Sequence, residues 1–167
     1  MRLRLITLAL STLTMTACAG GSTTASDKST PSQTPTATLS PTEDYIAKAE
    51  ALCADATGRM ASLASPTTPA EYVASREQSA EITRGVVTGL DRLTPPAADR
   101  ARVEKSFLVP LRSIAQSMEA SLPKIRAAAP KGLAAMQALP VPPVVKADIT
   151  DMKAYGFYNC FQLVYVG

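Results

Sequence analysis

Apolar residues recur every three or four positions through much of residues 42–158, which is the spacing of one face of an α-helix. Two capping boxes with a proline at the first helical position mark the predicted starts of two helices, Ser40-Pro41-Thr42-Glu43 and Thr68-Pro69-Ala70-Glu71. The predicted inward residues are Tyr45, Ala49, Leu52, Cys53, Ala56, Met60 and Leu63 in the first helix, and Tyr72, Ser75, Ser79, Ile82, Val86, Gly89 and Leu93 in the second.

Prolines divide the following stretch into shorter predicted helices. The third has inward residues Val103, Phe107, Leu111, Ile114 and Met118. Pro110 is expected to kink it, because proline lacks the N–H that an α-helix needs. Pro123 and Pro130 interrupt the next stretch, so residues 124–139 are predicted to form one or two short helices.

The C-terminal part begins with Pro-Val-Pro-Pro at residues 140–143, which predicts a stiff connector. A last helix is expected from about residue 144 to residue 158, with inward residues Val145, Ile149, Met152 and Tyr155. Residues 161–166 have a β-like composition, and we expect an extended tail docked on the bundle. The predicted fold class is all-α, a small antiparallel bundle of four to five helices over residues 42–167.

The N-terminus has the pattern of a lipoprotein export signal over residues 1–17. Arg2 and Arg4 precede an uncharged, mostly apolar stretch that is too short to span a bilayer as a mature helix. Small residues precede Cys18, as lipidation of that cysteine requires. Ordinary cleavage after Ala19 is the alternative, and it would release an unlipidated protein. We favour lipidation of Cys18, because a long polar segment follows it.

That polar segment, residues 18–41, is rich in Ser, Thr, Pro, Ala and Gly. Such a composition buries too little apolar area to offset the entropy of ordering, so a disordered tether is expected. The density of Ser, Thr and Pro is compatible with an O-glycosylated stalk or with a plain spacer, and the plain spacer is favoured.

Three cysteines in an exported chain leave one possible pair once Cys18 carries lipid. Cys53 and Cys160 are expected to be oxidised outside the cytoplasmic membrane and to close the domain with a structural disulfide. A redox-active pair is less favoured, since the two cysteines lack CxxC spacing.

Composition excludes several chemistries. The chain of 167 residues contains no His and no Trp, so His-based triads and His-based zinc sites are impossible. Without Arg2 and Arg4, fifteen basic and fourteen acidic residues leave a net charge of +1. With no basic block, nucleic acid is not an expected partner. We expect no cofactor and no metal.

A few clusters could carry chemistry, and each also has an ordinary structural explanation. Glu77 with Glu81 and Asp148 with Asp151 are spaced like paired carboxylates, but such pairs usually lie on a solvated face. Gly85 and Gly89 favour close helix packing over a ligand cleft. Two larger groups are interpreted as an ordinary charged face (Asp99, Arg100, Arg102, Glu104, Lys105) and as core or the lining of a pocket (Tyr155, Phe157, Tyr158, Phe161, Tyr165).

Several motifs together resemble small actinobacterial cell-envelope lipoproteins of unknown function. They are the lipobox, the Thr/Pro-rich tether, Leu52-Cys53-Ala54-Asp55, the Leu-Thr-Pro-Pro-Ala segment at residues 93–97 and Tyr155-Gly156-Phe157-Tyr158-Asn159-Cys160. The resemblance implies an envelope location and the Cys53–Cys160 pairing. It assigns no catalytic residue.

The sequence thus favours a non-catalytic binding module, held by lipid on the extracytoplasmic face of the cell membrane. Its expected partners are the membrane, through the anchor, and an envelope protein or cell-wall component. A lipoprotein that binds a small ligand in a pocket of the bundle is the alternative, and an enzyme is the least favoured class. The sequence leaves the oligomeric state open.

Overall fold

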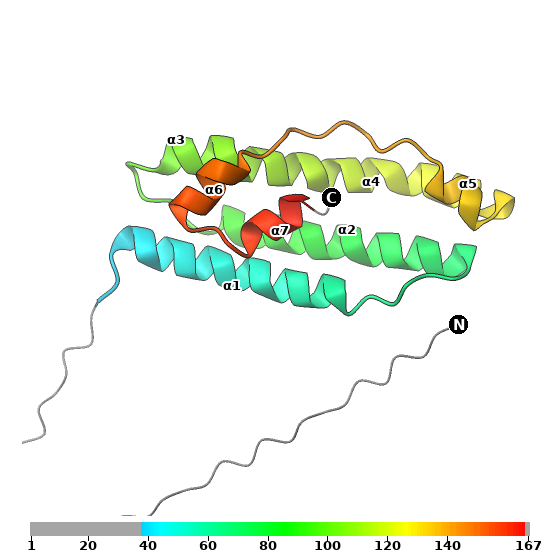
Figure 1. Ribbon diagram of the computed structural model, residues 1–167, viewed down its shortest axis with the longest axis horizontal. Helices are drawn as coiled ribbons and strands as arrows, with labels where there is room; N and C mark the ends of the chain where they lie inside the picture. Colours follow the sequence, from blue (N-terminus) through cyan, green and yellow to red (C-terminus); the bar gives the residue numbers. More distant parts are fainter. Residues whose placement is uncertain (1–37, 166–167) are drawn as a thin grey trace, which may run out of the picture. The chain divides into compact units, whose positions relative to one another are not determined.

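The computed structural model describes residues 38–165, with side chains described up to Val164, and this region is helical with no β-strand (Figure 1). The predicted all-α bundle is confirmed. The expectations for the signal and for residues 18–37 lie outside the described residues. The helices are α1 (Pro41–Ala61), α2 (Pro69–Asp91), α3 (Arg100–Val103), α4 (Val109–Ala128), α5 (Leu133–Gln137), α6 (Ile149–Tyr155) and α7 (Cys160–Tyr165).

Both predicted capping boxes are confirmed. The Ser40 hydroxyl accepts a hydrogen bond from the Glu43 backbone N–H at 3.2 Å, and the Glu43 carboxylate accepts one from the Ser40 N–H at 2.8 Å. Thr68 and Glu71 repeat the arrangement at the start of α2. These side chains satisfy backbone donors that have no partner inside a helix, which fixes where α1 and α2 begin.

The long helices form the frame of the bundle, and the C-terminal segment closes it. α2 packs against both α1 and α4, while α7 packs against α1 and α4. Figure 1 shows α6 and α7 lying across the layer of long helices. The main core is formed by buried residues of all these elements: Tyr45, Ala49, Cys53, Ala56, Ile82, Val86, Leu90, Val103, Phe107, Leu108, Leu111, Met152, Phe157 and Cys160.

A disulfide joins Cys53 of α1 to Cys160 of α7, as the cysteine count predicts. Both cysteines are fully buried, and their Cα atoms lie 4.9 Å apart. Glu50, one turn before Cys53, accepts hydrogen bonds from the backbone N–H groups of Asn159 and Cys160 at 2.7 and 3.0 Å. A covalent bond and a capping carboxylate therefore hold the start of α7 on α1.

At Pro110, where a kink is predicted, the chain stays helical from α3 through to α4. Residues Glu104–Leu108 form a π-helical turn between α3 and α4, in which the Val109 N–H reaches back to the Glu104 carbonyl. This wider turn precedes Pro110, whose ring would otherwise crowd the carbonyl four residues earlier.

The break predicted at Pro123 is wrong, since α4 continues through Pro123 to Ala128. Pro123 and Glu119 are both exposed, so water can solvate the carbonyl that loses its helical partner. Of the one or two short helices predicted over residues 124–139, the first part belongs to α4 and the rest forms α5, which follows a 3-10 turn at Ala129–Lys131.

The C-terminal part contains two further corrections. Residues 140–148 are non-helical, so the last helix does not begin near Val144, and Val145 is exposed. Helix α6 starts later because Asp148 accepts a hydrogen bond from the Asp151 N–H at 2.9 Å and caps it. It ends at Gly156, whose positive φ of 110° suits glycine.

The expected extended tail is likewise wrong, because residues 160–165 form α7. Tertiary contacts outweigh the β-like composition of this segment, since Glu50 and Cys53 both hold its first turn.

Candidate functional site

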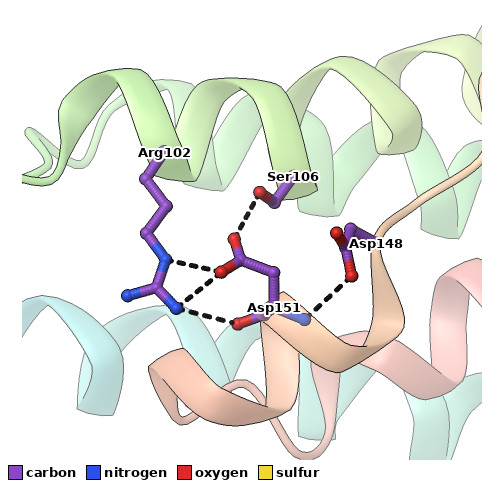
Figure 2. A network of polar contacts seen from close by, with 4 residues as sticks. All are labelled: Arg102, Ser106, Asp148 and Asp151. Carbon is purple, nitrogen blue, oxygen red and sulfur yellow. Dashed lines mark hydrogen bonds and ion pairs between the residues drawn. The ribbon is translucent and has the colours of Figure 1, made fainter.

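Polar side chains from three parts of the chain meet where α6 lies against the π-helical turn, and Figure 2 shows four of them. We call this group the α6 cluster, and it consists of Thr42, Asp99, Arg102, Ser106, Asp148, Asp151 and Tyr155. It brings carboxylate, guanidinium and hydroxyl groups together, and its contacts decide what it can do.

Asp151 is the centre of the α6 cluster. Its carboxylate accepts a hydrogen bond from Arg102 Nε at 2.7 Å and another from the Ser106 hydroxyl. Figure 2 shows the guanidinium and the hydroxyl reaching the carboxylate from neighbouring turns of one helical segment. The hydrogen bonds from Arg102, and next from Ser106, hold the pKa of Asp151 below its usual value. A carboxylate with a lowered pKa is a weaker base at neutral pH.

Asp99 receives the remaining hydroxyl groups of the α6 cluster. Thr42 of α1 and Tyr155 of α6 each donate a hydrogen bond to Asp99 Oδ2 at 3.1 Å. Burial, and then the hydrogen bond to Asp99, raises the pKa of Tyr155. Arg102 lies 5.2 Å from the centre of the Tyr155 ring. The phenol therefore stays protonated at neutral pH and joins α6 to the loop before α3.

A second group of charges links α2 to the helix after it. Arg112 of α4 pairs with Asp91 at the end of α2 and with Glu104 in the π-helical turn. At the other end of the bundle, Arg126 of α4 pairs with Glu77 of α2 at 2.7 Å. These ion pairs connect neighbouring elements, and each is too exposed to add more than a small stabilisation.

The predicted carboxylate pairs are not brought together as paired acids. Asp148 caps α6 while Asp151 faces Arg102. Glu77 faces Arg126. Within residues 38–165, no three His, Cys, Asp or Glu side chains gather in a way that could hold a metal ion. The α6 cluster could not be predicted from the sequence, because Arg102 and Asp151 are 49 positions apart in the chain.

The predicted charged face is only partly a solvated face. Asp99, Arg102 and Glu104 each contact another element, as described above. The mixture of opposite charges over residues 99–105 is compatible with ion pairs but does not identify their partners.

The C-terminal aromatic residues divide into core and surface. Phe157 is 1% exposed and its ring centre lies 4.6 Å from that of Phe107, 5.1 Å from Tyr155 and 6.2 Å from Tyr45. Tyr158, by contrast, is 62% exposed. These rings fill the space between α1, the π-helical turn and α6, so the interpretation of Phe157 as core holds, and the alternative of a pocket beside it is not supported.

Phe161 is partly buried beneath the Lys153 ammonium, which lies 4.2 Å from the ring centre. The side chain of Tyr165 lies outside the described residues. Of the two glycines, only Gly89 marks a close approach, since a Cβ there would lie 3.0 Å from Leu52 of α1. Gly85 faces open space, so the predicted small-residue step is confirmed at Gly89 alone.

A groove of about 340 Å³ lies where the start of α1 meets the end of α2. Tyr45 contributes to its wall, together with Pro41, Asp44, Lys48, Arg92, Leu93, Thr94 and Pro96. Asp44 and Lys48 are already paired with each other at 2.7 Å. The groove lies at the surface, and through Tyr45 its wall adjoins the aromatic core around Phe157.

The Tyr45 hydroxyl is buried and has no hydrogen-bond partner among the described residues. Burial, and next the Glu104 carboxylate, raises the pKa of Tyr45 to about 12. An unpartnered buried hydroxyl carries a desolvation cost that a phenylalanine would not carry.

Removing the Tyr45 hydroxyl is therefore expected to be harmless or stabilising. Tyr45→Phe should raise the free energy of unfolding by up to about 1 kcal/mol. The matched variant Tyr155→Phe, which loses its bond to Asp99, should lower it by about 0.5–1.5 kcal/mol. Urea unfolding of both variants at neutral pH distinguishes the two hydroxyls, and equal losses would contradict the assignment.

Alkaline pH provides a second test of Tyr45. The native hydroxyl keeps its proton to about pH 12, whereas the unfolded one loses it near pH 10.0. The raised pKa thus supplies stability that is present below pH 10 and is lost as the pH rises towards 12. Between pH 10 and pH 12, the free energy of unfolding of Tyr45→Phe should therefore fall less than that of the wild type.

The ion pair between Asp151 of α6 and Arg102 contributes to stability at neutral pH and loses this contribution at low pH. Because the pKa of Asp151 is lowered, its contribution is present above the ordinary value of 3.8 and disappears as the pH falls through the native pKa. At pH 7, Asp151→Asn should lower the free energy of unfolding by about 1–2 kcal/mol, a value limited by solvent at a side chain that is 28% exposed.

Urea unfolding between pH 2 and pH 7 measures this difference. Asp55→Asn, at an exposed carboxylate paired only within α1, is the matched control and should change little. A loss at Asp151 that stays constant down to pH 2 would show that charge is not its cause.

Comparisons of the chain with protein-family models, with curated proteins and with solved structures gave no match. The class of the protein therefore rests on its own geometry, an all-α bundle closed by a disulfide.

Proposed function

We propose that this protein is a lipid-anchored module that binds a partner in the cell envelope and catalyses no reaction. In this proposal Cys18 carries the lipid and residues 18–41 connect the anchor to the bundle. The supporting observation is that the groups most suited to catalysis are engaged in joining helices. Ser106 and Arg102 are held by Asp151, and Tyr155 is held by Asp99.

The surface offers a different kind of feature, which favours binding. Exposed valines gather on the segment between α5 and α6, with Val141 at 75%, Val145 at 48% and Val144 at 37% exposure. Apolar side chains that are exposed together on a segment fixed to the fold are typical of sites that contact another macromolecule. This surface supports an interaction module over a hydrolase or transferase.

Crosslinking in intact cells tests the proposed function. The full chain with a C-terminal tag is crosslinked, recovered from the membrane fraction and compared with a Cys18→Ser variant. We expect one or more envelope components to be enriched with the wild-type chain and lost with Cys18→Ser, which should leave the membrane fraction.

Two results would count against the proposal. A wild-type chain that recovers nothing beyond a tag-only control would contradict the binding module. A Cys18→Ser variant that stays with the membranes would contradict the lipid anchor.

A further inference from the structure

Residues 140–148, in the segment between α5 and α6, run along the surface of α4 without forming a helix or a strand (Figure 1). We call this stretch the connector. Pro140, Pro142 and Pro143 fix their own φ near −65°, and each proline pushes the residue before it into an extended conformation. These restrictions favour polyproline II geometry over the first half of the connector.

Two serines one turn apart on α4 hold the connector in place. The Val145 N–H donates a hydrogen bond to the Ser113 hydroxyl at 2.9 Å, and the Ser117 hydroxyl donates one to the Pro142 carbonyl at 3.4 Å. The pairing makes the connector run antiparallel to α4. Its backbone is thus ordered when the domain folds, so a partner would not have to order it on binding.

Exposure around Pro142 is consistent with a helix of three residues per turn. Pro142, which is bonded to α4, is only partly exposed, whereas its neighbours on both sides are exposed. Residues three apart in polyproline II geometry share a ridge. Over residues 140–144 the connector therefore presents two outer ridges, one formed by Pro140 and Pro143 and the other by Val141 and Val144. Val145, three residues after Pro142, is also exposed, so the three-residue repeat ends before it.

We propose that the connector is a docking strand for a protein domain whose groove is lined by aromatic side chains. Grooves of this kind recognise proline-rich segments by packing against their outer ridges. Strand addition is a poor alternative, because the three prolines have no N–H to donate to a partner strand. Lys146 is exposed just beyond these ridges, so the groove should end at an acidic side chain.

This inference rests on the proposed function, since it names the surface and the kind of partner for the same binding module. A second copy of this chain is a weaker candidate, because the described residues have few exposed aromatic side chains to line such a groove, with Tyr158 the large exposed one. A lipid surface is also disfavoured, since one lysine supplies little attraction to anionic headgroups.

Direct binding tests the docking strand. The probe is a panel of purified SH3 and WW domains, which have aromatic grooves, titrated against the full mature chain in detergent. We expect binding by members with an acidic side chain beside the groove, weakened at least about tenfold by Val141→Ser with Val144→Ser. Lys146→Glu should also weaken it. Failure of every domain in the panel to bind would overturn the proposal.

The matched control is Leu39→Ser with Tyr158→Ser, which removes two exposed apolar side chains outside the connector. This control should bind as the wild type does. Equal weakening in the control and the connector variant would overturn the proposal, because it would show non-specific binding through exposed apolar side chains. Thermal melts of both variants should match the wild type, since the replaced side chains are exposed.

Repeating the cell crosslinking with the connector variant separates this inference from the proposed function. A partner recovered by the wild type and lost by the connector variant supports both. A partner recovered equally by both chains keeps the binding module and overturns the docking strand. Concentration-dependent dimers that vanish in the connector variant would also overturn it, in favour of a second copy.

Discussion

Replacing both cysteines of the disulfide, as Cys53→Ala with Cys160→Ala, is expected to lower the free energy of unfolding by about 2–5 kcal/mol. The bond spans 107 positions, so it removes much of the freedom of the unfolded chain. It also holds α7 on α1, and both sulfur atoms lie in a filled core. Urea unfolding of the variant beside the wild type measures the loss.

The reduced wild-type chain is the control for the alanine pair. It should unfold at a similar urea concentration to the variant, and the oxidised wild type should unfold well above both. A variant as stable as the oxidised wild type would contradict a structural disulfide.

The second large effect is expected at Phe157, because its ring is the point where α1, the π-helical turn and the C-terminal segment meet. Phe157→Ala should lower the free energy of unfolding by about 3–5 kcal/mol, through lost burial and the cavity left behind. Its neighbour Tyr158 is exposed, so Tyr158→Ala should change stability by less than about 0.5 kcal/mol.

This pair of variants also distinguishes a filled core from a ligand pocket. A ring that lines an open pocket can be shortened at little cost to folding, whereas a ring packed on three others cannot. Similar small changes at Phe157 and Tyr158 would contradict the filled core.

The long helices were predictable because their signals are local. Ser40 with Glu43 and Thr68 with Glu71 lie within one helical turn, and the apolar spacing identified the inward face of α1. In α2 it identified Tyr72, Ile82 and Val86 but missed the buried residues Ala80, Thr83 and Leu90. The disulfide was predictable for a different reason, since the assignment of Cys18 to lipid left one possible pair.

The errors lie where distant residues decide the local structure. Ser113 bonds the backbone of Val145, in a stretch where the apolar spacing predicts the start of a helix. Glu50 and Cys53 stabilise α7 against its β-like composition. Local sequence patterns indicate neither effect, because the partners lie many positions away and belong to other helices.

The candidate site shows the same limit more strongly. Asp148 could be identified as a helix cap from its own neighbourhood, but the pairing of Asp151 with Arg102 depends on how α6 lies on the bundle. Their spacing is that of paired carboxylates, whereas in the fold Asp148 caps α6 and Asp151 pairs with Arg102.

Intact mass spectrometry of the membrane-extracted protein, with and without reductant, decides whether it is a lipid-anchored, disulfide-closed module. We predict a chain that begins at Cys18 with diacylglycerol attached and that gains hydrogen mass only after reduction of the Cys53–Cys160 bond. A mass beginning at Gly20 without lipid would contradict the anchor. Free thiols at Cys53 and Cys160 before reduction would contradict the closed bundle.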